Sequence, residues 1–362
     1  MSATTDMADI PRPAAAAPAA TRSVETVQFL RFVAAGMVLI AHVSFFVHHR
    51  VDTDVRILGE VAQGVALFFV ISGFIMTVTA SPHSGEPGFV RYFALSRLIR
   101  IVPLYWAVNA AKLLGFVLVP GMIAANPTVS NVVYSLLFLP AKNADGNIEA
   151  FYGVGWSLNF EMAFYALFAL ALLLGKRPTR FTIPILLAAG ALSFLKTEAW
   201  PTAAYLLSPA LFNFVWGILI GEWYLSGRKL PVPIAVALIA AGTAATFVPL
   251  AALQGLLVTK VHMGAIVLGF VALEDRIGQA IPKLLTFLGD ASYSLYLTHP
   301  MVGVLSVVVL HKLAPWMPSS LIFVLTVLLC LVFSAASFIY FEKPITLWLR
   351  KRLLKRGKSV ES

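Results

Sequence analysis

The feature that most constrains this chain is a series of long apolar stretches, each close to the length that crosses a lipid bilayer. The hydrocarbon core of a bilayer is about 30 Å thick, which an α-helix spans with roughly 20 residues. Ten such stretches occur, at residues 26–47, 61–80, 101–120, 156–174, 181–196, 206–225, 231–249, 252–273, 284–310 and 320–341. Backbone polar groups in lipid must be satisfied within the segment, which excludes open strands. We therefore expect an all-α, polytopic membrane helix bundle of about ten transmembrane helices.

Composition supports lipid rather than water as the solvent. Hydrophobic residues make up 59% of the chain and charged residues 12%, whereas soluble domains carry about 25% charged residues. The formal net charge of +10 would indicate a nucleic-acid partner in a soluble protein. Basic residues of membrane proteins gather in cytoplasmic loops instead, so we expect contact with membrane lipid and no nucleic acid.

Basic residues also predict the orientation of the helices. Ten spans place both termini on one side of the membrane. With that side cytoplasmic, the inside segments hold 19 Lys and Arg residues and the outside segments hold 5. This asymmetry follows the positive-inside rule. We therefore expect a multi-pass protein of the cytoplasmic membrane with both termini in the cytoplasm.

The two ends of the chain differ from its apolar region. Residues 1–24 are mostly Ala, Pro, Thr and Ser, which bury too little apolar surface to become ordered, and they lack the apolar core of a signal peptide. We expect a disordered cytoplasmic tail at 1–24, a transmembrane domain at 25–345 and a basic cytoplasmic tail at 346–362. The apolar run at 129–139 is too short to span and is expected to be re-entrant or interfacial.

Ionisable side chains inside the spans are candidates for function, because each costs about 2.5–3.5 kcal/mol to insert at a helix centre. Arg31 and His42 lie eleven residues apart in the first span, which places them on nearly the same helix face with about 16 Å of rise between them. The structural alternative is an arginine that reaches the interface and an interfacial histidine. Lys112 and Lys260 also fall within spans.

Arg97 and Arg100 are three residues apart, just before the third span. Both would project from the start of a helix on the cytoplasmic side. Two guanidinium forks beside a helix N-terminus favour a phosphate group. The alternative for this pair is topological anchoring by the positive-inside rule.

Glu161 follows Trp156 at the start of the fourth span, about one helical turn below the outer interface. A carboxylate at that depth requires a partner. His42 enters the same leaflet from the other direction, so we expect a His42–Glu161 pair in which the carboxylate fixes the imidazole tautomer and raises its basicity.

The ninth span carries a polar stripe formed by Tyr293, Tyr296 and His299 at successive i, i+3 positions. An interfacial aromatic belt is the structural alternative, but His299 is too deep for that role. We expect the stripe to face a cavity or a partner. In the second span, Ser72 and Gly73 favour close helix packing, although the Ser72 hydroxyl could also bind a substrate, and Gly217 and Gly221 form a GxxxG packing motif.

Several motifs of other enzyme classes are absent from the sequence. There is no Walker loop, HExxH, GxSxG or cysteine-based metal spacing. The single cysteine, Cys330, excludes an internal disulfide and a thiolate metal cluster. No metal is predicted.

These motifs together resemble the acyltransferase-3 family of integral-membrane acyltransferases, close to the branch that acetylates bacterial exopolysaccharides. The matching segments are Leu30-Arg31 through His42, Gly64 to Phe74, Arg97 to Ile101 with Pro103 and Tyr105, Trp156-Ser157-Leu158 with Glu161 and Tyr165, and Tyr293-Ser294 with Tyr296-Leu297 and His299. They occur in order across spans one to four and span nine. The resemblance implies a bacterial inner-membrane enzyme that transfers an acyl group, usually acetyl from acetyl-CoA, to a hydroxyl of a free or lipid-linked carbohydrate.

The resemblance and the residues together give a mechanistic hypothesis. Catalysis is expected from His42, as general base or transient acyl acceptor, with Glu161 orienting it. The expected donor site comprises Arg31, Arg97, Arg100 and Ser72, and the expected acceptor site comprises Trp156, Tyr293, Tyr296 and His299. The alternative function is a saccharide transporter or flippase in which buried His and Glu form a proton relay.

Overall fold

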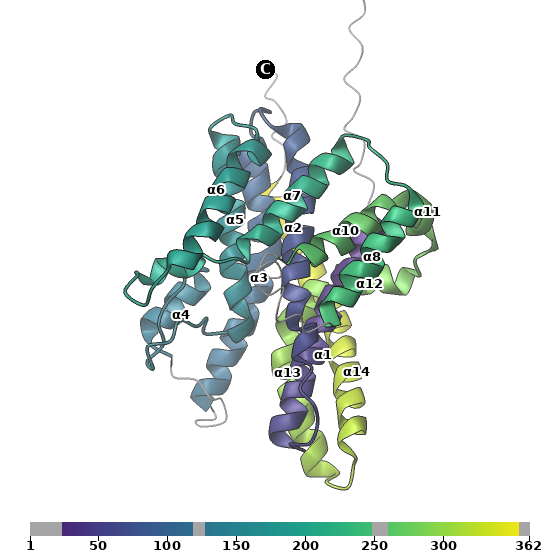
Figure 1. Cartoon of the computed structure of the whole chain (residues 1–362). Coiled ribbons are helices and arrows are strands. Elements are labelled where there is room, and N and C mark those ends of the chain that lie inside the picture. The colour runs from purple at the N-terminus through teal and green to yellow at the C-terminus, as the bar shows by residue number, and fades with distance from the viewer. Residues whose placement is uncertain (1–23, 119–126, 248–259, 355–362) are drawn as a thin grey trace, which may run out of the picture.

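The computed structural model describes residues 24–118, 127–247 and 260–354. The described chain is a bundle of helices (Figure 1). The longer helices are α1 (Glu25–Arg50), α2 (Gly64–Ala80), α3 (Phe89–Leu118), α5 (Trp156–Leu173), α6 (Pro178–Leu192), α7 (Leu211–Leu225), α8 (Val232–Phe247), α10 (Val261–Ala272), α13 (Ser292–Leu313) and α14 (Ser319–Ser337). Shorter helices are α4 (Val129–Leu136), α11 (Glu274–Ile277), α12 (Lys283–Asp290) and α15 (Lys343–Leu353).

The all-α prediction is confirmed, and each expected span overlaps one of the ten longer helices. Seven helical segments in the described ranges are long and apolar enough to cross a membrane. The helices α7, α8 and α10 are apolar but shorter, with 15, 16 and 12 residues. Residues 252–259 of the expected eighth span lie outside the described residues, as do 1–23 and 355–362 of the expected tails. Residues Val129–Leu136 of the run at 129–139 form the short helix α4.

Three departures from the predicted helix bounds affect the residues of the site. The helix α3 begins at Phe89, so Arg97 and Arg100 lie inside it and not at its N-terminus. The helix-dipole part of their predicted phosphate site is therefore wrong, because that effect fades within the first turn. The ninth span is divided at Ala291 into α12 and α13, and α14 continues through a π-helical turn, Phe338–Glu342, into α15.

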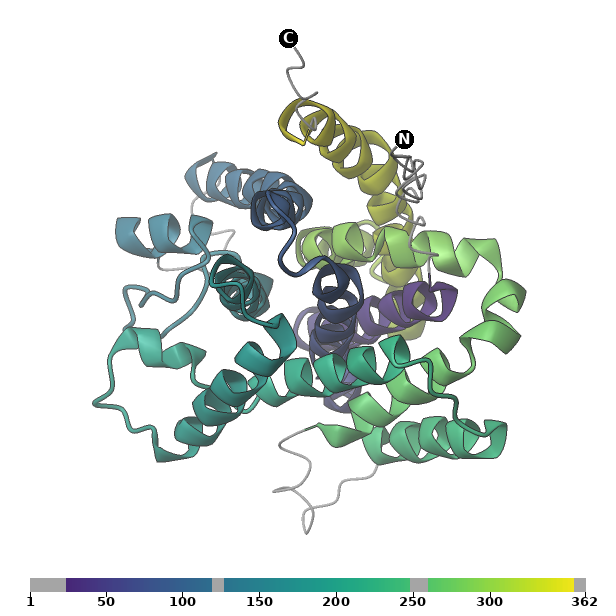
Figure 2. The same cartoon turned by 90° about the horizontal axis from the view of Figure 1, so that it is seen from above.

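The close crossing of α2 and α7 forms the centre of the packing, and Figure 2 shows α2 near the middle of the bundle with α1 and α7 beside it. A Cβ atom added at Gly217 would lie 2.0 Å from the Val70 carbonyl oxygen, and one at Gly73 would lie 2.3 Å from the Phe214 carbonyl oxygen. Only glycine permits this backbone approach. The predicted packing role of Gly73 and Gly217 is confirmed.

An aromatic stack fills the space beside this crossing. The Phe214 ring of α7 stacks on Phe69 of α2 at 4.5 Å and on Phe164 of α5 at 4.4 Å between centroids. Phe164 and Phe214 are almost fully buried. This stack joins α2, α5 and α7 into one wall, and α5 thereby presents its polar residues toward α1 and α3.

Candidate functional site

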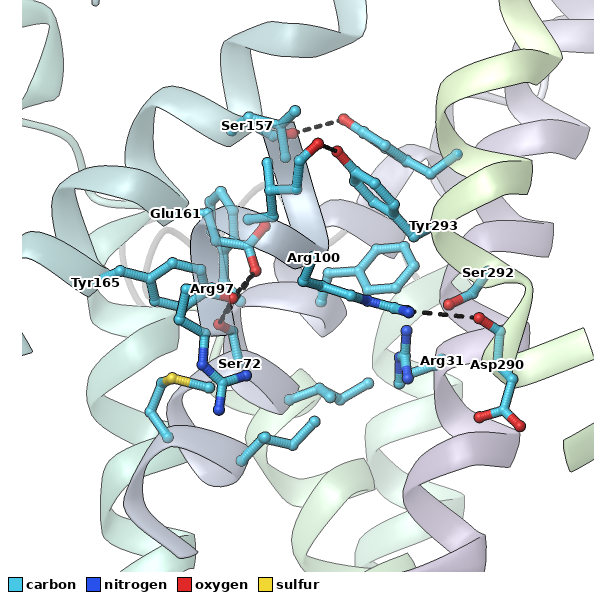
Figure 3. Close-up of a pocket in the computed structure, with 18 of the residues that line it drawn as sticks. Arg31, Ser72, Arg97, Arg100, Ser157, Glu161, Tyr165, Asp290, Ser292 and Tyr293 are labelled. Carbon is cyan, nitrogen blue, oxygen red and sulfur yellow. Dashed lines mark hydrogen bonds between the residues drawn. The ribbon is translucent and has the colours of Figure 1, made fainter. Parts of the chain in front are cut away.

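A cavity of about 380 Å³ lies between α1, α2, α3, α5 and α13, with further lining from α12, the π-helical turn and α15 (Figure 3). Its volume falls within the range of small-molecule pockets, about 300–1,000 Å³. The charged residues on its wall are Arg31, Arg97, Arg100, Arg350, Glu161 and Asp290. Four arginines thus face two carboxylates, so the wall favours an anionic ligand.

Arg31 and Arg97 are two partly buried arginines of the cavity wall with spare hydrogen-bond donors. Arg31 donates from Nη1 to the Gln28 side chain at 2.8 Å. Arg97 donates from Nη2 to Thr79 Oγ1 at 3.4 Å, while its buried Nε has no hydrogen-bond partner. Neither guanidinium has a carboxylate within 4 Å in the described ranges. A buried guanidinium donor without a partner is costly, and an anion in the cavity would satisfy it.

Arg100 is held by a buried carboxylate that the sequence analysis did not identify. Its Nη1 lies 2.7 Å from Glu342 Oε1, and Glu342 is only 3% exposed. Ser294 donates to the other carboxylate oxygen at 2.6 Å, and the Arg100 guanidinium lies 5.8 Å from the Tyr293 ring centroid. These contacts fix Arg100 against α13 and direct it into the cavity, where Figure 3 shows it near Arg31 and Asp290.

Glu161 lines the arginine cavity and is not paired with His42. Its carboxylate accepts hydrogen bonds from Tyr165 and, at 3.4 Å, from Ser72. In Figure 3 these three side chains converge beside Arg97. The expected His42–Glu161 pair is therefore wrong: Tyr165, one turn along α5, and Ser72 of α2 both donate to Glu161 Oε1, and His42 contacts His299 instead. The predicted placement of Ser72 at a ligand site is consistent with this cluster.

His42 instead pairs with His299. The His299 Nε2 and His42 Nδ1 atoms are 3.2 Å apart, and the ring centroids are 4.9 Å apart. His299 is fully buried, whereas His42 is partly exposed. The Nδ1 atom of His42 lies 2.9 Å from the Val38 carbonyl oxygen, and that of His299 lies 3.0 Å from the Leu295 carbonyl oxygen.

These contacts determine the tautomer of both rings. A carbonyl oxygen can only accept, so each Nδ1 carries a proton. The Nε2 atom of neutral His299 then accepts from His42 Nδ1–H, which it shares with the Val38 carbonyl. The lone pair of His42 therefore resides on Nε2, which is the state required of a general base.

The tyrosines of α13 connect the histidine pair to the cavity. Tyr293 and Tyr296 both line it, and the Tyr296 ring lies 6.1 Å from the His299 ring. Tyr293 donates to the Ile101 carbonyl at 2.6 Å, and the Tyr296 hydroxyl contacts Ser157 Oγ at 2.7 Å. The expectation that the stripe faces a cavity is confirmed for the tyrosines. Trp156 does not line the cavity and packs against Phe69 and Phe160.

Two of the charged site residues that the sequence did not predict lie beyond the expected end of the last span, whereas Asp290 lies inside the predicted ninth span. Glu342 comes one residue after the predicted span, and Arg350 lies in the segment interpreted as a basic tail. An acidic residue beside an apolar span was the available signal for Glu342. In the described ranges no group of three or more His, Cys, Asp and Glu residues is arranged to hold a metal ion.

Comparison with known families identifies the chain. A family described as "Acyltransferase domain" matches residues 24–335, which include the cavity arginines of α1 and α3 and both histidines. The chain belongs to this acyltransferase family. The predicted resemblance is therefore confirmed. Because the family is one of acyltransferases, the site has to be explained as that of a group-transfer enzyme and not of a transporter.

Two relatives refine the comparison. The chain is 33% identical over 314 residues to "Exopolysaccharide production protein ExoZ" of Rhizobium meliloti (strain 1021), covering 82% of this chain and 91% of the relative. It is 32% identical over 256 residues to "Putative membrane-bound transacylase BcsY" of Komagataeibacter xylinus, covering 65% and 64% of the two chains. No solved structure matches the chain.

Proposed function

We propose that this membrane acyltransferase moves an acetyl group from cytoplasmic acetyl-CoA to a hydroxyl of an exopolysaccharide or of its lipid-linked precursor, within a bacterial inner membrane. The acceptor class is supported by the relatives, one named for exopolysaccharide production and the other for transacylation. The excess of basic residues in the inside segments supports a cytoplasmic donor.

The observation that carries the proposal is a cavity rich in arginine that adjoins a histidine pair. Acyl-CoA is a polyanion with a long neutral arm that ends in a thioester. Arg31, Arg97 and Arg100 offer guanidinium forks suited to its phosphates. The arm then follows the rise of about 16 Å from Arg31 to His42 along α1, past Tyr296.

The proposed chemistry is direct transfer with His42 as the general base. His42 Nε2 takes the proton of the acceptor hydroxyl while its oxygen forms a bond with the thioester carbonyl carbon. The carbon–sulfur bond then breaks, and the departing thiolate of CoA receives a proton from the imidazolium. His299 holds His42 in the required tautomer throughout, and is a positioning residue. Glu161, with Ser72 and Tyr165, balances the arginine charge when no donor is bound.

Radiolabelled acetyl-CoA and membranes containing the protein test this proposal. We expect label in the polysaccharide and release of free CoA. His42→Ala should abolish both without reducing protein abundance, because a positioned base contributes about 10²–10⁴-fold. His49→Ala is the matched control, since His49 is an exposed histidine near the end of the same helix. Near-normal turnover in His42→Ala would remove the catalytic assignment.

The donor site has its own kinetic signature. Arg97→Ala and Arg100→Ala should raise the apparent KM for acetyl-CoA by more than they lower kcat, because they remove binding to the donor in both ground and transition states. An unaltered KM in both variants would refute the phosphate role. Movement of unlabelled saccharide across the membrane without CoA release would instead identify a transporter.

A further inference from the structure

The helix α15 lies beyond the part of the chain that the family match covers, yet it contributes a wall residue to the cavity. The match ends at residue 335, whereas Arg350 of α15 lines the cavity together with three arginines of α1 and α3. The helix packs against α3 and follows the π-helical turn that carries Glu342. Arg350 is also near enough to Arg97 for the two guanidinium charges to repel each other.

Interfacial anchoring explains the other basic residues of α15 but not Arg350. Arg352 stacks over the Trp348 ring at 4.5 Å, an arrangement common at membrane interfaces. Arg350 has no hydrogen-bond or carboxylate partner for its guanidinium among residues 24–118, 127–247 and 260–354, and it adds a fourth positive charge where three already meet. Gathering like charges costs free energy unless an anion occupies the space between them.

The four arginines of the cavity differ in their exposure to solvent. Arg31, Arg97 and Arg100 are partly buried between helices, whereas Arg350 is exposed. The donor proposed above has phosphates at two places, a diphosphate next to the arm and a 3′-phosphate on the ribose, farthest from the thioester. The exposed arginine corresponds to the phosphate that lies farthest from the reacting carbon.

We propose that Arg350 binds the ribose 3′-phosphate of the acyl donor and so makes the enzyme selective for CoA over donors that lack this group. The inference rests on the proposed function, because it assumes a CoA thioester in the cavity. It assigns α15 a part in donor recognition.

Binding of CoA and of dephospho-CoA, which lacks only the 3′-phosphate, tests the inference without an acceptor. The full chain in nanodiscs should bind CoA about tenfold more tightly than dephospho-CoA, as expected for one hydrogen-bonded charge pair at an exposed site. In Arg350→Ala the two dissociation constants should become equal through weaker binding of CoA alone. Arg350→Lys should keep part of the preference, because the ammonium retains the charge.

Two control variants separate this effect from general electrostatics. Arg352→Ala removes the same charge from the same helix and should leave the CoA preference unchanged. Arg97→Ala should weaken both ligands by a similar factor. If Arg350→Ala keeps the wild-type preference, or if the wild type has none while binding CoA, only the inference about Arg350 is overturned. If the wild type binds neither ligand, the proposed donor is overturned as well.

Discussion

At the scale of single residues, His299 and the Val38 carbonyl together hold His42 in the tautomer whose Nε2 is free to act as a base. The Nε2 atom of His299 accepts from His42 Nδ1–H, while its own Nδ1 donates to the Leu295 carbonyl. His299→Ala should therefore lower kcat about tenfold or more, within the range that a positioned base supplies. The KM for acetyl-CoA should hardly change, because His299 does not line the cavity. Steady-state kinetics with varied acetyl-CoA measure both parameters.

A conservative variant distinguishes positioning from simple packing. The amide oxygen of glutamine reaches about as far as histidine Nε2 and can accept from His42. His299→Gln should therefore recover part of the kcat lost in His299→Ala. Equal kcat values in the two variants would show that His299 only fills space.

Glu342 allows a similar comparison on the donor side. Its carboxylate lies 2.7 Å from Arg100 and fixes that side chain against α13. Glu342→Ala should raise the KM for acetyl-CoA about three- to tenfold, because Arg100 loses the buried ion pair that holds it in place. Glu342→Gln should stay closer to the wild type, since an amide of the same length can still accept from Ser294 and remain beside Arg100. If both variants raised KM equally, charge and not position would be the contribution of Glu342.

The sequence predicted which residues belong to the site better than it predicted their partners. The cost of ionisable groups in lipid identified Arg31, His42, Glu161 and His299, and the structure brings each to the cavity or to the histidine pair. The same argument paired His42 with Glu161, because the sequence indicates how deep each residue lies in the membrane but not how α5 is rotated about its own axis. That rotation places Glu161 beside Ser72 of α2, while Tyr165 lies one turn farther along α5 itself.

At the scale of helices, the approach of α2 to α7 positions Ser72 and the α5 wall. Gly217→Ala would place a methyl group 2.0 Å from the Val70 carbonyl oxygen, which forces the helices apart at a cost of about 1–3 kcal/mol. We expect a lower thermal unfolding midpoint in detergent and reduced activity. Gly36→Ala is the control, because nothing lies within 4 Å of its added Cβ. Its midpoint should be unchanged or higher, as alanine favours helix. A stable Gly217→Ala variant would contradict the close crossing.

Helix positions were predictable from apolar length, whereas helix ends were not. Hydropathy places the centre of a span correctly because lipid selects apolar residues there. It does not mark where a helix continues past the lipid, so α3 begins at Phe89 before the predicted start at 101. The break at Ala291 lies inside the predicted span at 284–310, where Asp290 and Ser292 interrupt the apolar residues. Gly289, two residues earlier, packs on the Gln28 backbone.

At the scale of the whole molecule, the proposed reaction requires that the arginine cavity open toward the compartment that contains acyl-CoA. The connection between α7 and α8 should then face the cytoplasm, and that between α13 and α14 should face the opposite side. Ser226 and Trp316 are exposed residues in these two connections. The single native cysteine, Cys330, is fully buried, so the wild-type chain supplies an unlabelled background for cysteine variants.

Labelling with a membrane-impermeant maleimide tests this orientation. Ser226→Cys should react in inside-out vesicles and be protected in right-side-out vesicles, because the positive-inside rule places its connection in the cytoplasm. Trp316→Cys should show the reverse pattern, and both should react after detergent treatment. The reverse assignment would place the donor arginines on the outer face, away from cytosolic acyl-CoA. In the proposed topology the chain crosses the membrane three times between residues 226 and 316, through α8, α10 and α13. Labelling of both positions from one side would require an even number of crossings, so one of the short helices α8 and α10 would not cross.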